Sequence, residues 1–150
     1  MKKIVWISLF WMLSANTIAQ QQIKNFTSGS YEQIVNQYQK QPLVMVLWSI
    51  DCPPCYKELE MLGREQKQHA VNLVLISTDG VEASNEVTDI LKQYNLQSAD
   101  NWLFDEFSSQ RLRYEIDPLW YGELPRSYLF NKAHQRKAVS GVLSADQLSK

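Results

Sequence analysis

The sequence predicts an α/β sandwich in which helices flank a central mixed β-sheet. Two continuous apolar segments of strand length, residues 42–50 and 70–78, have the composition of strands that are buried on both faces. Segments with a helical spacing of apolar residues alternate with them. Near the end of the chain, residues 126–131 and 136–142 have the pattern of an antiparallel hairpin. Alternation followed by an antiparallel pair is typical of an α/β fold with a mixed sheet.

The individual elements can be assigned in chain order. Residues 30–40 predict a first helix, because Ser30 is followed three residues later by Gln33 in a capping-box pattern. The apolar segment 42–50 is expected to be the central strand, and Pro53 suits the first turn of the helix that follows it. The other predicted elements are a strand at 70–78, helices at 82–95 and 108–116, the hairpin at 126–131 and 136–142, and a closing helix at 144–150.

The composition indicates one globular domain. The chain has 150 residues, of which 45% are hydrophobic, and this is enough apolar area for a core. No repeat or linker divides residues 20–150. The 15 Lys and Arg residues nearly balance 16 Asp and Glu residues and form no basic stripe, so no nucleic-acid partner is expected.

Residues 1–19 have the pattern of a signal peptide. Two lysines precede the apolar segment 4–13, and Thr17 and Ala19 place small residues at the −3 and −1 positions of a cleavage site. The apolar segment is shorter than the roughly 20 residues of a membrane span. We therefore expect cleavage near Ala19 and a mature domain of residues 20–150 that is periplasmic or secreted. The alternative is an uncleaved N-terminal membrane anchor that faces the periplasm.

The two cysteines of the chain, Cys52 and Cys55, allow three kinds of site. A zinc site needs four ligands, but the two histidines, His69 and His134, do not have the spacing of a zinc finger. A disulfide that closes so short a loop constrains the unfolded chain little, so it is a weak structural staple. Two thiolates can bind Cu(I), and a copper-handling protein is therefore an alternative that stays open.

A redox couple explains the cysteine pair better. Cys52 is expected at a helix N-terminus, where the helix dipole favours its thiolate, so that Cys52 attacks and Cys55 resolves the mixed disulfide. Pro53 and Pro54 have no N–H to donate to the thiolate. Asp51 adds negative charge if its carboxylate lies near the sulfur. Both features destabilise the thiolate and predict a reducing couple rather than a strong oxidant.

The segment "LWSIDCPPCYKELEML" (47–62) resembles the active-site segment of exported thiol-disulfide oxidoreductases of the TlpA/ResA type, which belong to the thioredoxin-like superfamily. In that group an apolar strand ends in Phe-Trp and is followed by Trp-Cys-x-Pro-Cys and by Lys-Glu. The corresponding residues here are Leu47, Trp48, Cys52, Pro54, Cys55, Lys57 and Glu58. The segment "GELPRSYLFN" (122–131) resembles the family's loop and strand that carry a cis-proline facing the disulfide.

This resemblance implies a thioredoxin fold for residues 20–150 and a role for each matching residue. Cys52 would be the nucleophile, Cys55 the resolving thiol, and Glu58 a carboxylate that helps to move protons. A cis bond between Leu124 and Pro125 would expose backbone groups that pair with a substrate strand. The alternatives are a solvated surface acid for Glu58 and an ordinary turn proline for Pro125.

The resemblance also implies a function. Family members reduce apocytochrome c or other disulfide-bonded envelope proteins, or prepare copper sites. The expected partners are therefore transient protein substrates that carry disulfides, together with an inner-membrane thiol protein as electron donor. No cofactor is expected besides the redox-active disulfide.

Two departures from the family pattern bear on the site. Asp51 occupies the position of the tryptophan that usually precedes the first cysteine, which alters the surroundings of the attacking sulfur. Val46 occupies the position of the buried strand acid of thioredoxins, so a proton relay depends on Glu58 or on water. For substrate binding we expect Leu124, Pro53, Pro54 and Trp120, with core packing as the alternative for Trp120.

Overall fold

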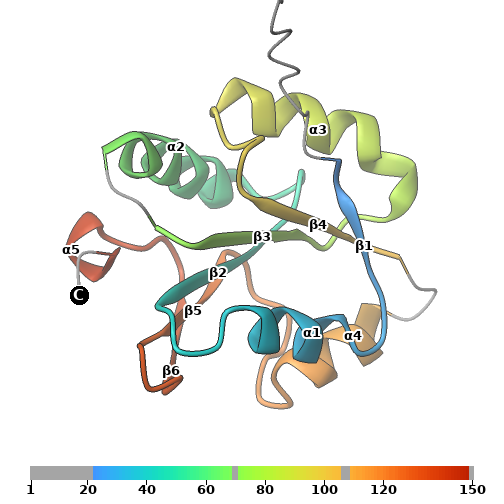
Figure 1. Ribbon diagram of the computed structural model, residues 1–150. Coiled ribbons are helices and arrows are strands. Elements are labelled where there is room, and N and C mark those ends of the chain that lie inside the picture. Colours follow the sequence, from blue (N-terminus) through green and yellow to red (C-terminus); the bar gives the residue numbers. More distant parts are fainter. Residues whose placement is uncertain (1–21, 69–70, 106–108, 149–150) are drawn as a thin grey trace, which may run out of the picture.

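A computed structural model describes residues 22–68, 71–105 and 109–148 of the chain (Figure 1). The predicted signal peptide, residues 1–19, lies outside the described residues. The described strands form one six-stranded sheet in the order β1-β4-β3-β2-β5-β6. The strands are β1 (Lys24–Phe26), β2 (Leu43–Trp48), β3 (Leu73–Ser77), β4 (Asp100–Phe104), β5 (Arg126–Phe130) and β6 (Arg136–Ser140).

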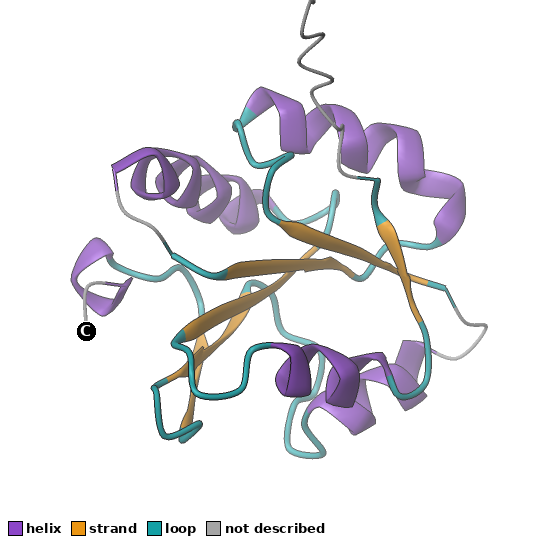
Figure 2. Cartoon of the chain, viewed as in Figure 1, coloured by secondary structure: helices purple, strands orange, loops and turns teal. Residues whose placement is uncertain are grey.

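The helices cover both faces of this sheet (Figure 2). In Figure 1, α2 and α3 lie above the sheet, and α1 and α4 lie below it. The helical elements are α1 (Ser30–Gln37), α2 (Pro53–Gln68), the short 3₁₀ helix η1 (Val81–Ala83), α3 (Ser84–Gln93), α4 (Ser109–Ile116) and α5 (Ala145–Leu148). Strands β1 to β4 pair in parallel, while β5 pairs antiparallel with both β2 and β6. The predicted mixed sheet flanked by helices is therefore confirmed.

Strand β2 lies between β3 and β5, inside the sheet, and all six of its side chains are buried. Alternate residues enter two separate apolar cores. Leu43, Met45 and Leu47 pack in the core next to α1 and α4. Val46 and Trp48 pack in the core next to α2 and α3, where the two cysteines also lie. The continuous apolar run in the sequence thus reflects burial on both faces, as expected for an inner strand of a sheet that helices cover on both sides.

The sequence pattern missed strands β1 and β4. Strand β4 begins with two polar residues, Asp100 and Asn101, so its sequence has the pattern of a loop. Both are buried, and both have partners elsewhere. The Nζ of Lys24 in β1 lies 2.7 Å from Asp100 Oδ1, and the side-chain amide of Asn101 donates to the carbonyls of Leu96 and Ala99. An ion pair with β1 for Asp100 and hydrogen bonds to the preceding loop for Asn101 therefore make polar residues tolerable in this strand.

The capping box predicted at Ser30 is wrong. Gly29 is the N-cap residue of α1, with a φ of 85° that favours glycine, and no side chain caps this helix end. The hydroxyl of Ser30 instead accepts a hydrogen bond from the backbone N–H of Thr27 at 3.0 Å. The serine thus closes the turn that leads into the helix.

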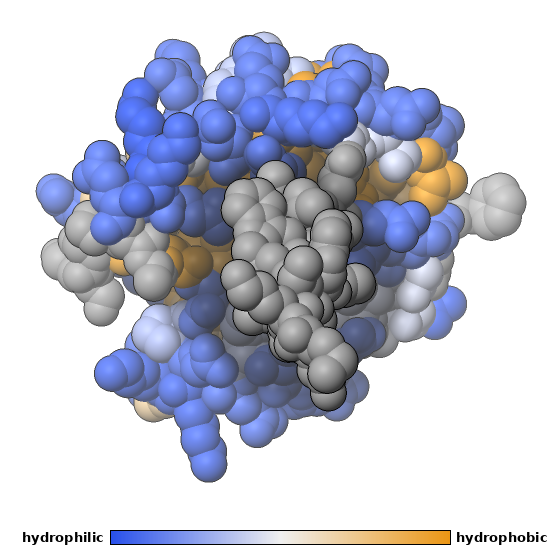
Figure 3. Space-filling view, turned by 45° about the horizontal axis from the view of Figure 1, so that its top comes forward, coloured by the Kyte–Doolittle hydropathy of each residue, from blue (hydrophilic) through white to orange (hydrophobic). Residues whose placement is uncertain are grey.

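The exterior of the described part is mainly hydrophilic in the view of Figure 3, with apolar side chains scattered between charged ones. Among the helices in the described ranges, none has the length and apolar content that crossing a bilayer requires.

Candidate active site

Cys52 and Cys55 form a disulfide at the N-terminus of α2. Cys52 directly precedes the helix, Cys55 lies in its first turn, and their Cα atoms are 5.3 Å apart. The backbone N–H of Cys55 donates to the carbonyl of Cys52 at 2.9 Å. Cys52 is 7% exposed and Cys55 is fully buried. The structure therefore has the predicted arrangement, with the first cysteine at the helix end and the second one deeper.

Pro53 and Pro54, the first two residues of α2, are exposed beside the disulfide. They suit this position because the first N–H groups of a helix have no intrahelical acceptor. They also leave the helix end with fewer N–H donors near the Cys52 sulfur. Both residues are exposed to solvent, and their role in substrate binding stays a prediction.

The loop between β2 and Cys52 is held by Asp79, a residue that the sequence analysis did not single out. Asp79 Oδ1 accepts from the hydroxyl of Ser49 at 2.8 Å, and Oδ2 accepts from the backbone N–H of Ile50 at 3.0 Å. Oδ2 also accepts from the hydroxyl of Ser77 at 2.6 Å. On the other side of the loop, the hydroxyl of Tyr56 donates to the carbonyl of Ile50 at 2.7 Å. Parallel strands place their carboxyl ends at one edge of the sheet, and this rule could have predicted the contact between Asp79 and the loop.

We expect replacement of Asp79 by alanine to loosen this loop. The change removes two charge-assisted hydrogen bonds to Ser49 and Ile50, and the expected loss of stability is about 1 to 3 kcal/mol. Urea unfolding of the oxidised protein measures the loss, and amide hydrogen exchange at Ile50 and Cys52 should become faster. The matched control is Asp89→Ala, since the Asp89 carboxylate is exposed and makes a 3.6 Å ion pair with Lys92. Equal effects of the two substitutions would contradict the role of Asp79.

Glu58 is a buried acid, not a solvated one. Its side chain is fully buried, and its Oε1 accepts a hydrogen bond from the hydroxyl of Ser127 at 2.8 Å. Its Oε2 has no hydrogen-bond partner among the described residues. Burial raises the pKa of Glu58 to about 7, against the smaller lowering effects of the Ser127 hydroxyl and the backbone of Leu143. A carboxyl group with such a pKa can both accept and release a proton near neutral pH.

Pro125 directly precedes β5, the strand next to β2, and the Leu124–Pro125 peptide bond is cis. Its carbonyl accepts a hydrogen bond from the backbone N–H of Gly141 at 2.9 Å. Leu124 is half-buried and packs against both apolar cores. The family resemblance therefore predicted the conformation of this bond, while the substrate-pairing role of the two residues stays a prediction.

A charged cluster ties the segment before Pro125 to the sheet. Arg126 Nη2 lies 3.0 Å from Asp117 Oδ2, and Arg126 Nη1 lies 3.1 Å from Glu123 Oε1. The hydroxyl of Tyr128 also donates to Asp117 at 3.0 Å. Burial raises the pKa of Asp117, but the backbone N–H of Leu119, the donors on Arg126 and Tyr128, and the charge of Arg136 outweigh it, so that the net pKa is lowered. No local pattern in the sequence indicated this cluster, because its members meet only through the turn.

The expected substrate contact of Trp120 is not supported by its position. Trp120 is 5% exposed, packs in the core next to α1 and α4, and donates its indole N–H to the carbonyl of Glu123 at 2.8 Å. Its neighbour Tyr121 is 91% exposed. The prediction for Trp120 was wrong because a large aromatic ring with a satisfied N–H is stable inside a core. Core packing, the alternative, describes this residue.

The described residues contain no cluster of three or more His, Cys, Asp or Glu side chains that could bind a metal ion. His134 is half-buried, and its Nε2 lies 2.7 Å from the carbonyl oxygen of Tyr38. His69 lies outside the described residues. Met61, the methionine close to the cysteines in sequence, is buried in the core and offers no exposed soft ligand for copper.

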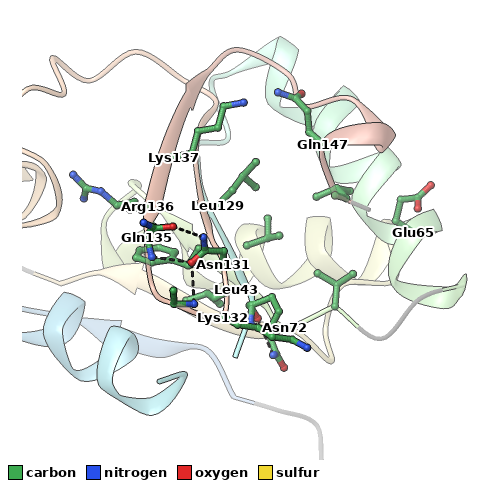
Figure 4. Close-up of a pocket in the computed structure, with 16 residues that line it drawn as sticks. Leu43, Glu65, Asn72, Leu129, Asn131, Lys132, Gln135, Arg136, Lys137 and Gln147 are labelled. Atoms are coloured by element: carbon green, nitrogen blue, oxygen red, sulfur yellow. Dashed lines mark hydrogen bonds between the residues drawn. The ribbon is translucent and has the colours of Figure 1, made fainter. Parts of the chain in front are cut away.

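A pocket of about 1150 Å³ opens at the other end of β2 from the disulfide (Figure 4). It is lined by residues at the start of β2, by the β5–β6 hairpin and by the end of the chain near α5, among them Leu43, Leu129, Lys137 and Gln147. Neither cysteine lines it. The pocket is therefore separate from the candidate active site.

No protein-family model matches the chain, and no curated protein matches its sequence. Its structure is similar to a secreted Mycobacterium tuberculosis disulfide oxidoreductase homologous to E. coli DsbE, with 21% identity over 76% of this chain and 81% of that one and a TM-score of 0.59. It is also similar to StoA from Bacillus subtilis, with 26% identity over 73% of this chain and 81% of that one and a TM-score of 0.53. A third similar structure is a thiol:disulfide interchange protein of the thioredoxin family from Chlorobium tepidum, with 18% identity over 73% and 75% of the two chains and a TM-score of 0.56.

These similarities show that the chain has the predicted thioredoxin fold, with the CxxC pair at a helix N-terminus. They also confirm the resemblance inferred from the sequence, since the similar structures are thiol-disulfide oxidoreductases of this fold.

Proposed function

We propose that this protein is an exported thiol-disulfide oxidoreductase that works as a disulfide reductase through Cys52 and Cys55. The observation that carries the proposal is the disulfide at the N-terminus of α2, with a slightly exposed first cysteine and a fully buried second one. This arrangement suits a reaction in which one sulfur meets the substrate and the other completes the exchange. The thiol-disulfide oxidoreductases of similar structure support the same activity.

The proposed reaction starts from the dithiol form. The Cys52 thiolate attacks one sulfur of a substrate disulfide, a mixed disulfide forms, and the second substrate sulfur leaves as a thiolate that takes up a proton. Cys55 then loses its proton and attacks the Cys52 sulfur, and the first substrate sulfur leaves and is protonated in turn. The substrate gains two electrons and two protons, and the protein ends with the Cys52–Cys55 disulfide.

Glu58 is the proposed proton acceptor for Cys55. It lies one helical turn after Cys55 on α2, and both side chains are fully buried. Bulk water has poor access to a buried thiol, so a nearby carboxyl with a pKa of about 7 can accept its proton at the moment of attack. Val46, at the place of the strand acid of thioredoxins, cannot do so.

We also propose a direction of electron flow and the partner proteins. The missing N–H groups of Pro53 and Pro54 and the exposed Asp51 side chain next to Cys52 favour a reducing couple. A reductase in an oxidising compartment needs a supply of electrons, and we propose an inner-membrane thiol protein as the donor. The proposed substrates are disulfide-bonded envelope proteins such as apocytochrome c. The disulfide itself is the redox centre, and the signal pattern of residues 1–19 supports a periplasmic or secreted location.

The reduction potential of the Cys52–Cys55 pair tests this proposal. Purified protein of residues 20–150 is equilibrated with glutathione or dithiothreitol buffers, and the thiol content is measured by alkylation and mass spectrometry. We expect a value near that of thioredoxin, about −270 mV. A value well above about −200 mV would assign the protein to the oxidants or isomerases. Failure of the reduced protein to reduce insulin disulfides, with a Cys52→Ser, Cys55→Ser double variant as the blank, would contradict the activity itself.

A further inference from the structure

Ser127 is a fully buried polar residue on β5 whose side chain faces the active-site layer of the fold. It pairs with Val46 of β2 in the antiparallel register, and Val46 packs in the same core as the two cysteines. Its hydroxyl donates to Glu58 Oε1 at 2.8 Å, a contact between residues 69 positions apart in the chain. A serine on β5 and a glutamate on α2 therefore meet beside the central strand.

This contact satisfies two groups that would otherwise be costly in an apolar layer. A buried hydroxyl and a buried carboxyl each need a partner, and apolar neighbours in this core such as Val46 and Leu129 have no polar side-chain atoms to offer. The hydrogen bond to Ser127 fixes one carboxyl oxygen of Glu58, whereas Oε2 has no partner among the described residues. Ser127 is thus the side chain that orients the Glu58 carboxyl, beside the backbone of Leu143, which also lowers the pKa of Glu58.

The charged residues next to Ser127 on β5 and next to Glu58 on α2 point away from the Glu58 carboxyl. Side chains alternate along β5, so Arg126 and Tyr128 lie on the opposite face of the sheet, where they contact Asp117. On α2, Lys57 and Glu60 are exposed. No charged side chain contributes to the pKa shift of Glu58. After reduction, Cys55 in the first turn of α2 and Cys52 directly before the helix become titratable thiols in the same layer.

We propose that Ser127 is a positioning residue for the exchange reaction, because its hydroxyl holds the Glu58 carboxyl in the orientation that receives the proton of Cys55. This inference rests on the proposed function. In the resolving step the S–H proton of Cys55 passes to Oε2 of Glu58. The electron pair of the Cys55 sulfur forms the bond to the Cys52 sulfur, and the bond between Cys52 and the substrate sulfur breaks. The substrate sulfur leaves with that electron pair as a thiolate, and Glu58 then returns the proton to solvent.

Two variants separate the hydroxyl of Ser127 from its bulk. Ser127→Ala removes the hydrogen bond to Glu58, whereas Ser127→Thr keeps a hydroxyl at the same position. The control is Ser30→Ala, because Ser30 is also buried and its hydroxyl also makes a hydrogen bond, but on α1 at the other face of the sheet. All variants are made in the chain of residues 20–150 and compared with the wild-type protein.

Reduction of insulin disulfides, followed as a function of pH, is the first readout. A hydrogen bond to the carboxylate lowers its pKa, so Ser127→Ala should shift the ionisation of Glu58 upward by about one pH unit. The fraction of ionised carboxyl near pH 7, and with it the rate of the resolving step, should fall about fivefold. Ser127→Thr should restore the wild-type profile, and Ser30→Ala should leave it unchanged.

The second readout does not depend on activity. Carboxyl ¹³C NMR of the oxidised protein follows the ionisation of Glu58 directly in each variant. An upward shift in Ser127→Ala that Ser127→Thr reverses supports the positioning role. Identical titrations in wild type and Ser127→Ala, or equal shifts in the alanine and threonine variants, would overturn it. If the titrations behave as expected but no variant reduces insulin, the proposed function fails while the control of Glu58 by Ser127 stands.

Discussion

Cys55→Ser is expected to accumulate a covalent adduct with a disulfide-bonded substrate, whereas Cys52→Ser is expected to form none. The reason is the unequal exposure of the two cysteines at the helix end, since Cys52 is 7% exposed and Cys55 is fully buried. Only a thiolate that meets the substrate can form the mixed disulfide, and only the partner cysteine can resolve it. Without Cys55 the reaction stops after the first exchange, and turnover falls to the level of the variant that lacks both cysteines.

Non-reducing gels and mass spectrometry of reduced protein mixed with oxidised insulin measure the adduct. Iodoacetamide applied to the reduced wild-type protein should modify Cys52 before Cys55, which tests the same order of reactivity without a substitution. The double variant Cys52→Ser, Cys55→Ser gives the background of non-covalent association. Equal adduct formation by the two single variants would show that the buried sulfur is as accessible as the exposed one and would remove the assignment of Cys52 as the nucleophile.

Glu58→Gln is expected to stabilise the oxidised protein at neutral and alkaline pH. Burial raises the pKa of Glu58 from the ordinary value of 4.5 to about 7. Between these two values the folded state binds more protons than the unfolded state, so the free energy of unfolding decreases as the pH rises. Above pH 7 the folded protein carries the full cost of a buried carboxylate, about 3 kcal/mol. Glutamine keeps the shape and a polar group for Ser127 without this cost.

Urea unfolding of the oxidised protein between about pH 4 and about pH 8 measures this difference. The two proteins should have similar stability at the acidic end, where Glu58 is neutral, and should diverge as the pH rises through the range from 4.5 to about 7. Glu60→Gln on the same helix is the matched control. Glu60 is exposed and pairs with Arg64, so its replacement should change stability by less than about 0.5 kcal/mol. A wild-type curve that stays parallel to that of Glu58→Gln across this range would contradict the burial of an ionisable carboxyl.

The same substitution links stability to activity. If the Glu58 carboxyl accepts the proton of Cys55, the more stable Glu58→Gln protein should be the slower reductase near neutral pH. A site that is less stable than its neutral substitute is common where a buried acid serves a reaction. Glu58 therefore lowers the free energy of unfolding at neutral pH, and the proposed proton transfer is the reason we give for a carboxyl group at this buried position.

The parts of this protein that could be read from its sequence are those with a strong local signal. An uninterrupted apolar run predicted β2, a proline after a cysteine predicted the start of α2, and the cysteine spacing predicted the redox pair. These signals are local because an apolar run, a proline without an N–H and a short spacing between cysteines can each be recognised from neighbouring residues alone. Strand β4 lacked such a signal, since it begins with Asp100, which pairs with Lys24 of β1, and Asn101, which bonds the backbone of the loop just before the strand.

The side chains that surround the two cysteines could not be predicted from local sequence signals. The family resemblance singled out Glu58 as a carboxylate near the cysteines, but its burial arises from the packing of α2 on the sheet, where β5 places Ser127 against it. Asp79 holds the Cys52 loop only because β3 ends beside β2, and Trp120 is a core residue only because its loop folds back over the sheet. The chemistry of the pair thus followed from composition and spacing, whereas burial, and with it the pKa of Glu58, arose from contacts between residues far apart in the chain, because desolvation depends on everything that packs around a group.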